Sequence, residues 1–173
     1  SMEFFATPWY ELFFKHQTKK YEVSHLEGTL NFIPYGCLVD HFQQVVYEHP
    51  EMTPQERNEA WLKLEKRYRP YLDLEGIPFY ERGAGWQRQN HIYASPFYYI
   101  DYCLAQTVAL QFWLEIEKDW DQAWVKYKEF VKRGGTDTFL GLVKGAGLTS
   151  PMEDGCLRSI AEYSGKWLEK HKI

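Results

Sequence analysis

The chain has 173 residues, of which 45% are hydrophobic and 25% charged, and its formal net charge is -4. This balance is ordinary for a globular protein. The negative charge argues against a nucleic-acid-binding surface, which needs a basic footprint. No apolar run approaches the roughly 18 residues of a membrane span. We therefore expect neither nucleic acid nor a membrane as a partner.

Aromatic residues are unusually frequent, at 18% of the chain, with seven Trp, thirteen Tyr and eleven Phe. A core of this size cannot hold all of them. We expect some to line a groove or a pocket, or to contact further chain of the same protein.

The three cysteines, Cys37, Cys103 and Cys156, are an odd number and show no CxxC spacing. A disulfide framework is not expected, and a reducing compartment fits better. The first residues lack the basic segment of a signal peptide. These features together predict a cytoplasmic location.

Helical patterns dominate the first part of the chain. Residues 2–15 are rich in Phe, Trp and Leu, and Pro8 is expected to interrupt or kink that stretch. Residues 17–30 show only a weak period, whereas residues 32–48 have apolar residues at helical spacing. We expect helices in this region, with an interruption or kink at Pro8.

The clearest helix start is Thr53-Pro54-Gln55-Glu56, where Thr53 suits the N-cap and Glu56 the third position of a capping box. This helix should run to about Tyr68. Residues 70–95 then form one irregular loop rich in Gly and aromatic residues. Short strands around Tyr80 or His91, forming a short hairpin, are an open alternative within this loop.

The remaining segments also predict helices. Ser95-Pro96 should open a helix that ends near Lys118. Ser150-Pro151-Met152-Glu153 repeats the Thr/Ser-Pro-x-Glu signal and should open the last helix. Between them we expect helices over residues 121–133 and 136–143. The predicted fold is all-α, with residues 1–173 as a single helical unit.

No complete catalytic motif is present in the sequence. None of the six histidines has another four residues away. The HExxH motif, in which two His on one helix face bind zinc and the Glu is the general base, is therefore absent. There is also no GxSxG motif and no Gly-rich phosphate loop.

The most distinctive segment runs from Gly83 and Gly85 through His91 to three tyrosines, Tyr98, Tyr99 and Tyr102. Both Tyr98 and Tyr99 are spaced to share a helix face with Tyr102. Phenol hydroxyls beside an imidazole can hold a substrate carbonyl or stabilise an oxyanion. On spacing alone, the competing interpretation is that the tyrosines are packing residues and that His91 caps a turn.

Five segments follow one another in order along essentially the whole chain: Ser1-Met2-Glu3-Phe4-Phe5, Asn31-Phe32-Ile33-Pro34-Tyr35-Gly36, Trp86-Gln87-Arg88-Gln89-Asn90-His91-Ile92-Tyr93, Ser95-Pro96-Phe97-Tyr98-Tyr99-Ile100-Asp101-Tyr102 and Ser150-Pro151-Met152-Glu153-Asp154-Gly155-Cys156. These segments resemble the C-terminal part of the oligoendopeptidase F type of zinc endopeptidases, in the thimet oligopeptidase family. The resemblance implies a helical domain that forms one wall of a peptide channel.

The same resemblance implies zinc in the complete enzyme and none in this chain. The HExxH motif and the third zinc ligand, a Glu, would precede Ser1. Glu3 would follow that ligand by roughly two helical turns, on about the same face. It is either a group that orients a zinc ligand without touching the metal or an acidic residue in an ordinary salt bridge.

The resemblance also implies catalytic roles for His91, Tyr99 and Tyr102, with Tyr98, Gly83 and Gly85 binding substrate. The family places one more residue between its His and its tyrosines, and it has a further Tyr where this chain has Ser95 or Pro96. It therefore stays open whether Tyr98 or Tyr99 is the functional tyrosine.

The function implied is that of the substrate-binding portion of a zinc endopeptidase that cleaves short peptides. Zinc would activate water and polarise the carbonyl, while His91 and the tyrosines stabilise the oxyanion. Its partners would be peptide substrates and the missing N-terminal part of the enzyme, and the isolated chain should be inactive. The alternative function is a non-catalytic helical module that binds peptides or another protein.

Overall fold

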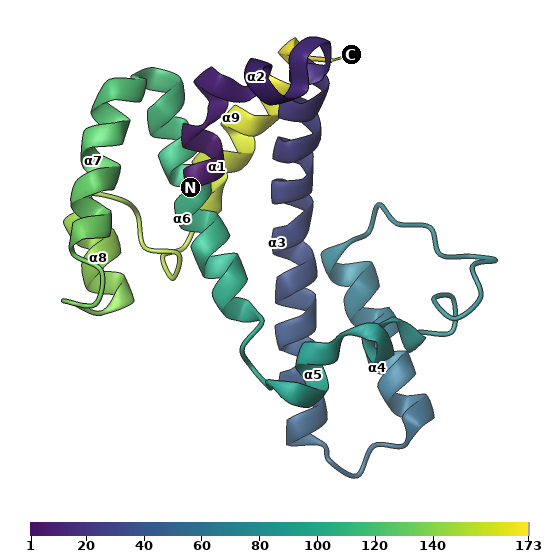
Figure 1. The fold of residues 1–173 in the computed structure, drawn as a ribbon. Helices are drawn as coiled ribbons and strands as arrows, with labels where there is room; N and C mark the ends of the chain where they lie inside the picture. Colours follow the sequence, from purple (N-terminus) through teal and green to yellow (C-terminus); the bar gives the residue numbers. More distant parts are fainter. Residues whose placement is uncertain (173) are drawn as a thin grey trace. The chain divides into compact units, whose positions relative to one another are not determined.

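A computed structural model describes residues 1–172, and in these residues every regular element is a helix. Figure 1 labels the α-helices. In chain order the elements are α1 (Met2–Phe5), η1 (Thr7–Trp9), α2 (Tyr10–Phe14), η2 (Lys15–Gln17), α3 (Thr18–Glu48), α4 (Pro54–Tyr68), η3 (Ala84–Arg88), α5 (Asn90–Ala94), α6 (Ile100–Lys118), α7 (Trp120–Lys132), α8 (Phe139–Gly145) and α9 (Cys156–Lys170), where η marks a 3-10 helix. The all-α prediction is confirmed.

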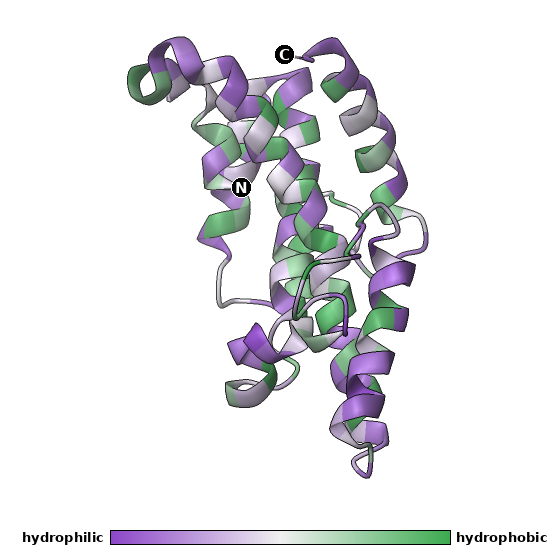
Figure 2. Cartoon of the chain, turned by 90° about the vertical axis from the view of Figure 1, so that its right-hand side faces the viewer, coloured by the Kyte–Doolittle hydropathy of each residue, from purple (hydrophilic) through white to green (hydrophobic). Residues whose placement is uncertain are grey.

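The chain divides into two compact units. One contains residues 1–29 and 104–172, and the other contains Leu30–Cys103. The helices α3 and α6 have residues in both units. Figure 2 shows hydrophobic and hydrophilic residues interleaved along the helices, as expected where one face of each helix is buried.

The unit of residues 1–29 and 104–172 is held together by aromatic packing around Phe5. The Phe5 ring lies 4.7 Å from Tyr127, 5.3 Å from Trp124 and 6.0 Å from Phe112, measured between ring centroids. The indole N–H of Trp120 donates to the carbonyl of Phe5 at 3.2 Å. Part of the large aromatic content therefore forms this core.

The core of Leu30–Cys103 centres on Phe42 of α3. Its ring lies 5.1 Å from Trp61 of α4 and 5.4 Å from Trp86 of η3. Trp86 also donates its indole N–H to the Asn58 side chain at 2.9 Å. The buried cluster comprises Leu38, Val39, Phe42, Trp61, Leu64, Trp86 and Ile92. It fixes η3 and α5 against α3 and α4.

The helix α3 runs without a break from Thr18 to Glu48 and contains Pro34, although the apolar period is weak over residues 17–30. A proline inside a helix removes one hydrogen bond and costs roughly 3 kcal/mol. Leu38, Val39 and Phe42, all on α3, are fully buried. Burial of such side chains contributes about 1.5–3 kcal/mol each, which offsets the cost of the proline.

The loop predicted over residues 70–95 is shorter than expected, and the alternative of a short hairpin is wrong. Residues 84–94 form η3 and α5, and the part of the chain described by the structure contains no strand. Gly83 adopts a φ of 76° and ends the irregular segment. The positions expected for strands, Tyr80 and His91, lie in a turn and in α5.

The helix expected at Ser95-Pro96 begins later, at Ile100, and ends at Lys118 as predicted. Phe97 has a φ of 61°, outside the helical region. Its N–H donates to the side-chain oxygen of the buried Gln43 at 2.9 Å. This contact holds residues 95–97 in a turn, so Tyr98 and Tyr99 stand just before α6.

Candidate functional site

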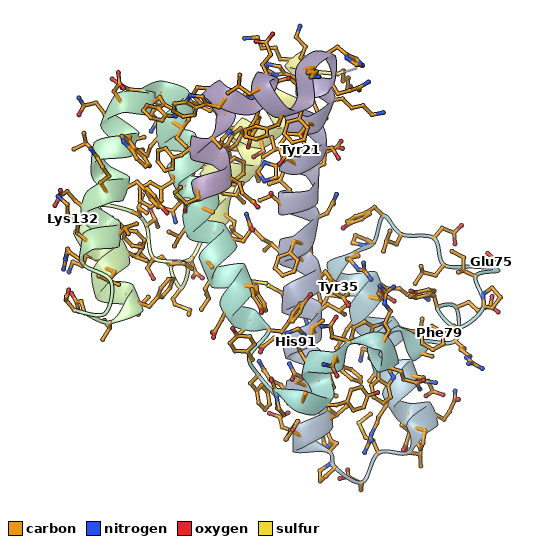
Figure 3. The ribbon with its side chains drawn as sticks, in the orientation of Figure 1. Tyr21, Tyr35, Glu75, Phe79, His91 and Lys132 are labelled. Carbon is orange, nitrogen blue, oxygen red and sulfur yellow. The ribbon has the colours of Figure 1, made fainter. Side chains whose placement is uncertain are left out.

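The segment that carries His91 is positioned by the core of Leu30–Cys103. His91 lies in the short helix α5, which also contains the buried Ile92. The turn at Phe97 then leads into α6, whose first turn contains Tyr102. Figure 3 labels His91 on α5 and Tyr35 on α3.

The structure brings His91 and the three tyrosines together. The imidazole centroid lies 5.1 Å from the Tyr99 ring, 5.9 Å from Tyr102 and 6.1 Å from Tyr98. The Tyr98 ring is nearly parallel to the imidazole, at 14°, whereas the Tyr102 ring is nearly perpendicular, at 88°. Tyr98 and Tyr102 remain 46% and 41% exposed, so both can be reached from solvent. The roles of these four residues stay predictions.

A hydrogen-bonded chain orients the imidazole. The Tyr35 hydroxyl donates to Oε1 of Gln89 at 3.0 Å. Nε2 of the same amide lies 2.9 Å from Nδ1 of His91. Because the amide nitrogen is a donor only, Nδ1 accepts, and neutral His91 carries its proton on Nε2. The ring therefore keeps one N–H free to donate to a substrate oxygen.

The hydroxyls of Tyr99 and Tyr102 stay protonated over the physiological range. Burial raises the pKa of Tyr99 to about 12, with smaller contributions from Tyr35, Cys103 and Tyr102. A hydrogen bond to Tyr98 raises the pKa of Tyr102. Both phenols can therefore donate hydrogen bonds at any pH at which the protein works.

Gly83 and Gly85 pack against α4. A Cβ on Gly83 would lie 2.1 Å from the carbonyl oxygen of Asn58, and one on Gly85 would lie 2.9 Å from Nε1 of Trp61. Gly83 also has positive φ, which glycine adopts at little cost. Both residues are buried, and they let η3 approach α4 closely. Their predicted contact with substrate stays a prediction.

A cavity of about 460 Å³ adjoins the His91 cluster. Tyr99, Gln89 and Gly85 line it, whereas Tyr35 contributes from α3. The other lining residues are Trp61, Glu65, Arg69, Leu72, Leu74, Ile77, Tyr80 and Arg88. The volume lies in the range of small-molecule and peptide side-chain sites.

Glu3 lies in the other unit, where its carboxylate contacts His25 with 3.1 Å between Oε2 and Nε2. The Glu3 side chain is 79% exposed and the His25 side chain 14%. His25 is stacked on Tyr21 and also contacts Phe4. The structure shows Glu3 and His25 in hydrogen-bonding contact, and both expectations for Glu3, an ordinary salt bridge and a role in orienting a zinc ligand, stay predictions.

Residues 1–172 do not provide a zinc site. Among them there is no group of three or more His, Cys, Asp or Glu side chains placed to hold a metal ion. His91 is surrounded by phenol rings and an amide, which are poor zinc ligands beside imidazole and thiolate.

Sequence reasoning missed the roles of Tyr35 and Gln89. Gln89 is two residues before His91, but only the folded chain shows that its amide contacts the imidazole. Tyr35 is separated from Gln89 by 54 residues in sequence. No local pattern could have indicated this pair.

Comparisons with known proteins identify the family to which the chain belongs. The sequence model of peptidase family M3 matches residues 1–162. A solved structure provisionally assigned as oligoendopeptidase F is 48% identical, with a TM-score of 0.91 over 97% of this chain and 30% of that one. PZ peptidase A, solved with an inhibitor, is 47% identical, with a TM-score of 0.92 over 98% and 30% of the two chains.

A third structure, also provisionally assigned as an oligoendopeptidase F, comes from Bacillus anthracis str. Ames. It is 42% identical, with a TM-score of 0.80 over 99% of this chain and 28% of that one. No curated protein matches the sequence significantly. The chain thus spans about 30% of the length of the first two structures.

The fold and the sequence match define a metallopeptidase segment. The chain belongs to peptidase family M3, a family of zinc peptidases, and its predicted resemblance to oligoendopeptidase F is confirmed. In residues 1–172 no helix is long and apolar enough to cross a membrane.

Proposed function

We propose that this chain forms the substrate-binding portion of a zinc endopeptidase of the oligoendopeptidase F type that hydrolyses short peptides. Family membership supports the peptidase chemistry. The single observation that carries the substrate-binding role is the contact of His91 with Tyr98, Tyr99 and Tyr102. This cluster presents several uncharged donors to one place, which suits a peptide carbonyl.

In this proposal, His91 and the tyrosines act on the carbonyl oxygen of the scissile bond. The Nε2–H of His91 and a phenol hydroxyl donate to that oxygen as negative charge develops on it. Tyr102 and Tyr99 are the proposed phenol donors, and Tyr98 contacts the substrate beside them. Each such donor is typically worth on the order of 10²–10³ in rate.

The zinc ligands and the general base are proposed to lie in the part of the peptidase that this chain does not span. Two observations support this: the chain corresponds to about 30% of its relatives, and residues 1–172 present no metal-binding cluster. The isolated chain is then inactive, and its two units belong to one larger catalytic domain. A cytoplasmic location remains part of the proposal.

Tyr102→Phe in the complete peptidase tests the proposal, because it removes one hydroxyl and keeps the ring. We expect kcat to fall about 10²-fold while zinc content stays unchanged. Tyr163→Phe is the matched control, because Tyr163 is 38% exposed and its hydroxyl bonds to Glu117 in the other unit. Unchanged turnover of Tyr102→Phe would reject the catalytic role and favour the interpretation that the tyrosines are packing residues.

A further inference from the structure

The cavity beside the His91 cluster has an excess of positive charge. Arg69 and Arg88 line it, and Glu65 is the one carboxylate in its lining. Glu65 is 4% exposed, and both of its oxygens already have partners. Trp61 donates to Oε2 at 3.0 Å, and Arg69 forms an ion pair through Oε1. Glu65 therefore neutralises Arg69 alone.

Arg88 has no carboxylate partner among residues 1–172. Its guanidinium contacts the Tyr80 hydroxyl and lies over the Tyr80 ring, 5.7 Å from the centroid. Tyr80 lines the same cavity. A guanidinium has five N–H donors in a planar fork, so this contact leaves most of them unused.

Arg69 also has unused hydrogen-bonding capacity. Its Nε is buried and has no hydrogen-bond partner in the structure. Burial lowers the pKa of Arg69, and repulsion from Arg88 lowers it further, so the two guanidinium groups feel each other's charge. Two neighbouring cations with one carboxylate, which pairs with Arg69 alone, are complementary to a further anion at Arg88.

The cavity adjoins the proposed site, because one residue of the His91 cluster and one residue that contacts His91 line it. Gln89 lines the cavity and contacts Nδ1 of His91. Tyr99 lines the cavity, and its ring lies 5.1 Å from His91. A ligand in the cavity therefore lies next to a peptide held at His91. Leu72, Leu74 and Ile77 provide an apolar wall for a neighbouring side chain.

We propose that this cavity is an anion subsite in which Arg88, supported by Arg69 and Tyr80, binds a carboxylate of the peptide substrate. The inference rests on the proposed function, since the anion belongs to the peptide held at His91. The carboxylate is either the C-terminal one or that of an Asp or Glu side chain. Arg and carboxylate pair in a bidentate geometry, which also fixes the register of the peptide.

Isothermal titration calorimetry on the 173-residue chain tests the subsite without requiring catalysis. The probes are three acetylated pentapeptides: Ala-Gly-Ala-Gly-Leu with a free C-terminus, the same peptide amidated, and the amide with Glu in place of Leu. We expect the free acid to bind at least about tenfold more tightly than the amide, as for one charged hydrogen-bonded pair. Equal affinity of the Glu amide and the free acid would show that the subsite accepts both a C-terminal carboxylate and a side-chain carboxylate.

Arg88→Gln should weaken binding of the free acid by about tenfold and so remove its preference over the amide. Arg82→Gln is the matched control, because Arg82 is exposed and stacks over Phe79 on the loop before η3. Circular dichroism verifies that both variants remain helical. Arg69→Gln is a weaker test, because it also leaves the buried Glu65 without its cation.

Two results would overturn the subsite. If acid and amide bind equally and Arg88→Gln changes neither, the anion subsite is wrong, while peptide binding at His91 still stands. If none of the three peptides binds, the subsite is wrong and the peptide-binding role of this chain fails with it.

Discussion

Two histidine clusters, one in each unit, show how differently an imidazole can be placed. His91 has uncharged neighbours: an amide at Nδ1 and three phenol rings. His25 has a carboxylate at Nε2, from Glu3, and is stacked on Tyr21. A histidine among neutral donors suits a carbonyl oxygen, whereas a histidine bonded to a carboxylate fixes that carboxylate. This difference in neighbours distinguishes His91, the proposed catalytic group, from Glu3 and His25, which are proposed to position a zinc ligand.

The largest expected effect is a loss of kcat when His91 is replaced, which replacement of His25 should not reproduce. In the complete peptidase, His91→Ala should lower kcat by on the order of 10²–10³ and leave zinc content unchanged, because it removes a transition-state donor. His25→Ala is the matched variant, and its main expected effects are on stability and zinc affinity. Steady-state kinetics with zinc analysis on both proteins measures this. Equal losses of kcat would contradict the distinction.

The second effect concerns Glu3, whose carboxylate is held by His25 through Oε2 while most of its side chain stays exposed. If Glu3 orients a zinc ligand, Glu3→Gln should weaken zinc binding by about 10–100-fold, as for other groups that act through a ligand. A chelator competition assay on the complete peptidase measures this affinity. A surface ion pair alone is worth about 0–1 kcal/mol of stability and would leave zinc affinity unchanged.

The third effect sharpens the role of Gln89. Gln89→Leu removes the amide donor at Nδ1, so neutral His91 can shift its proton to that nitrogen. We expect kcat to fall about tenfold, since only part of the population then has an N–H directed at the substrate. Nitrogen NMR of the imidazole in the 173-residue chain reports the tautomer directly. A single Nε2–H form in the variant would show that Gln89 does not control it.

Sequence patterns predict the starts of helices well where the interactions that begin the helix are local. At Thr53 the capping box forms as expected: Glu56 N–H donates to the Thr53 hydroxyl at 3.3 Å, and Thr53 N–H to the Glu56 carboxylate at 2.7 Å. The same signal at Ser150 was wrong. There Met152 N–H donates to the Ser150 hydroxyl in a turn, and α9 begins only at Cys156.

The segment at Ser150 differs from the one at Thr53 because the residues that follow it do not continue into a helix. Gly155 has a φ of 79°, so the chain turns again before α9.

At the candidate site, the spacing and the resemblance predicted that His91 and Tyr102 would matter, and the structure places the centroids of their rings 5.9 Å apart. The Tyr35–Gln89 contact, and the position of Arg88 beside the local Glu65–Arg69 pair, depend on tertiary packing, which no local pattern encodes.

The smallest effect concerns one tyrosine in each cluster. Tyr10 lies 6.5 Å from His25, and its hydroxyl donates to the carbonyl of Glu3 at 2.5 Å, whereas Tyr99 lies beside His91. Burial raises the pKa of both phenols to about 12. An unfolded tyrosine ionises near pH 10, so the folded state binds more protons than the unfolded state between pH 10 and 12.

The stability contributed by each phenol should therefore be complete below pH 10 and lost as pH rises toward 12. Ultraviolet titration of the phenolate band should show late-ionising tyrosines that include Tyr10 and Tyr99, and Tyr10→Phe and Tyr99→Phe should each lower the late amplitude by one tyrosine. The free energy of unfolding, measured by urea titration at pH 8 and 11, should fall less between these pH values in either variant than in the unmodified chain. An unchanged late amplitude in Tyr99→Phe would show that burial at the His91 cluster does not hold this hydroxyl protonated. The comparison between the clusters would then rest on Tyr10 alone.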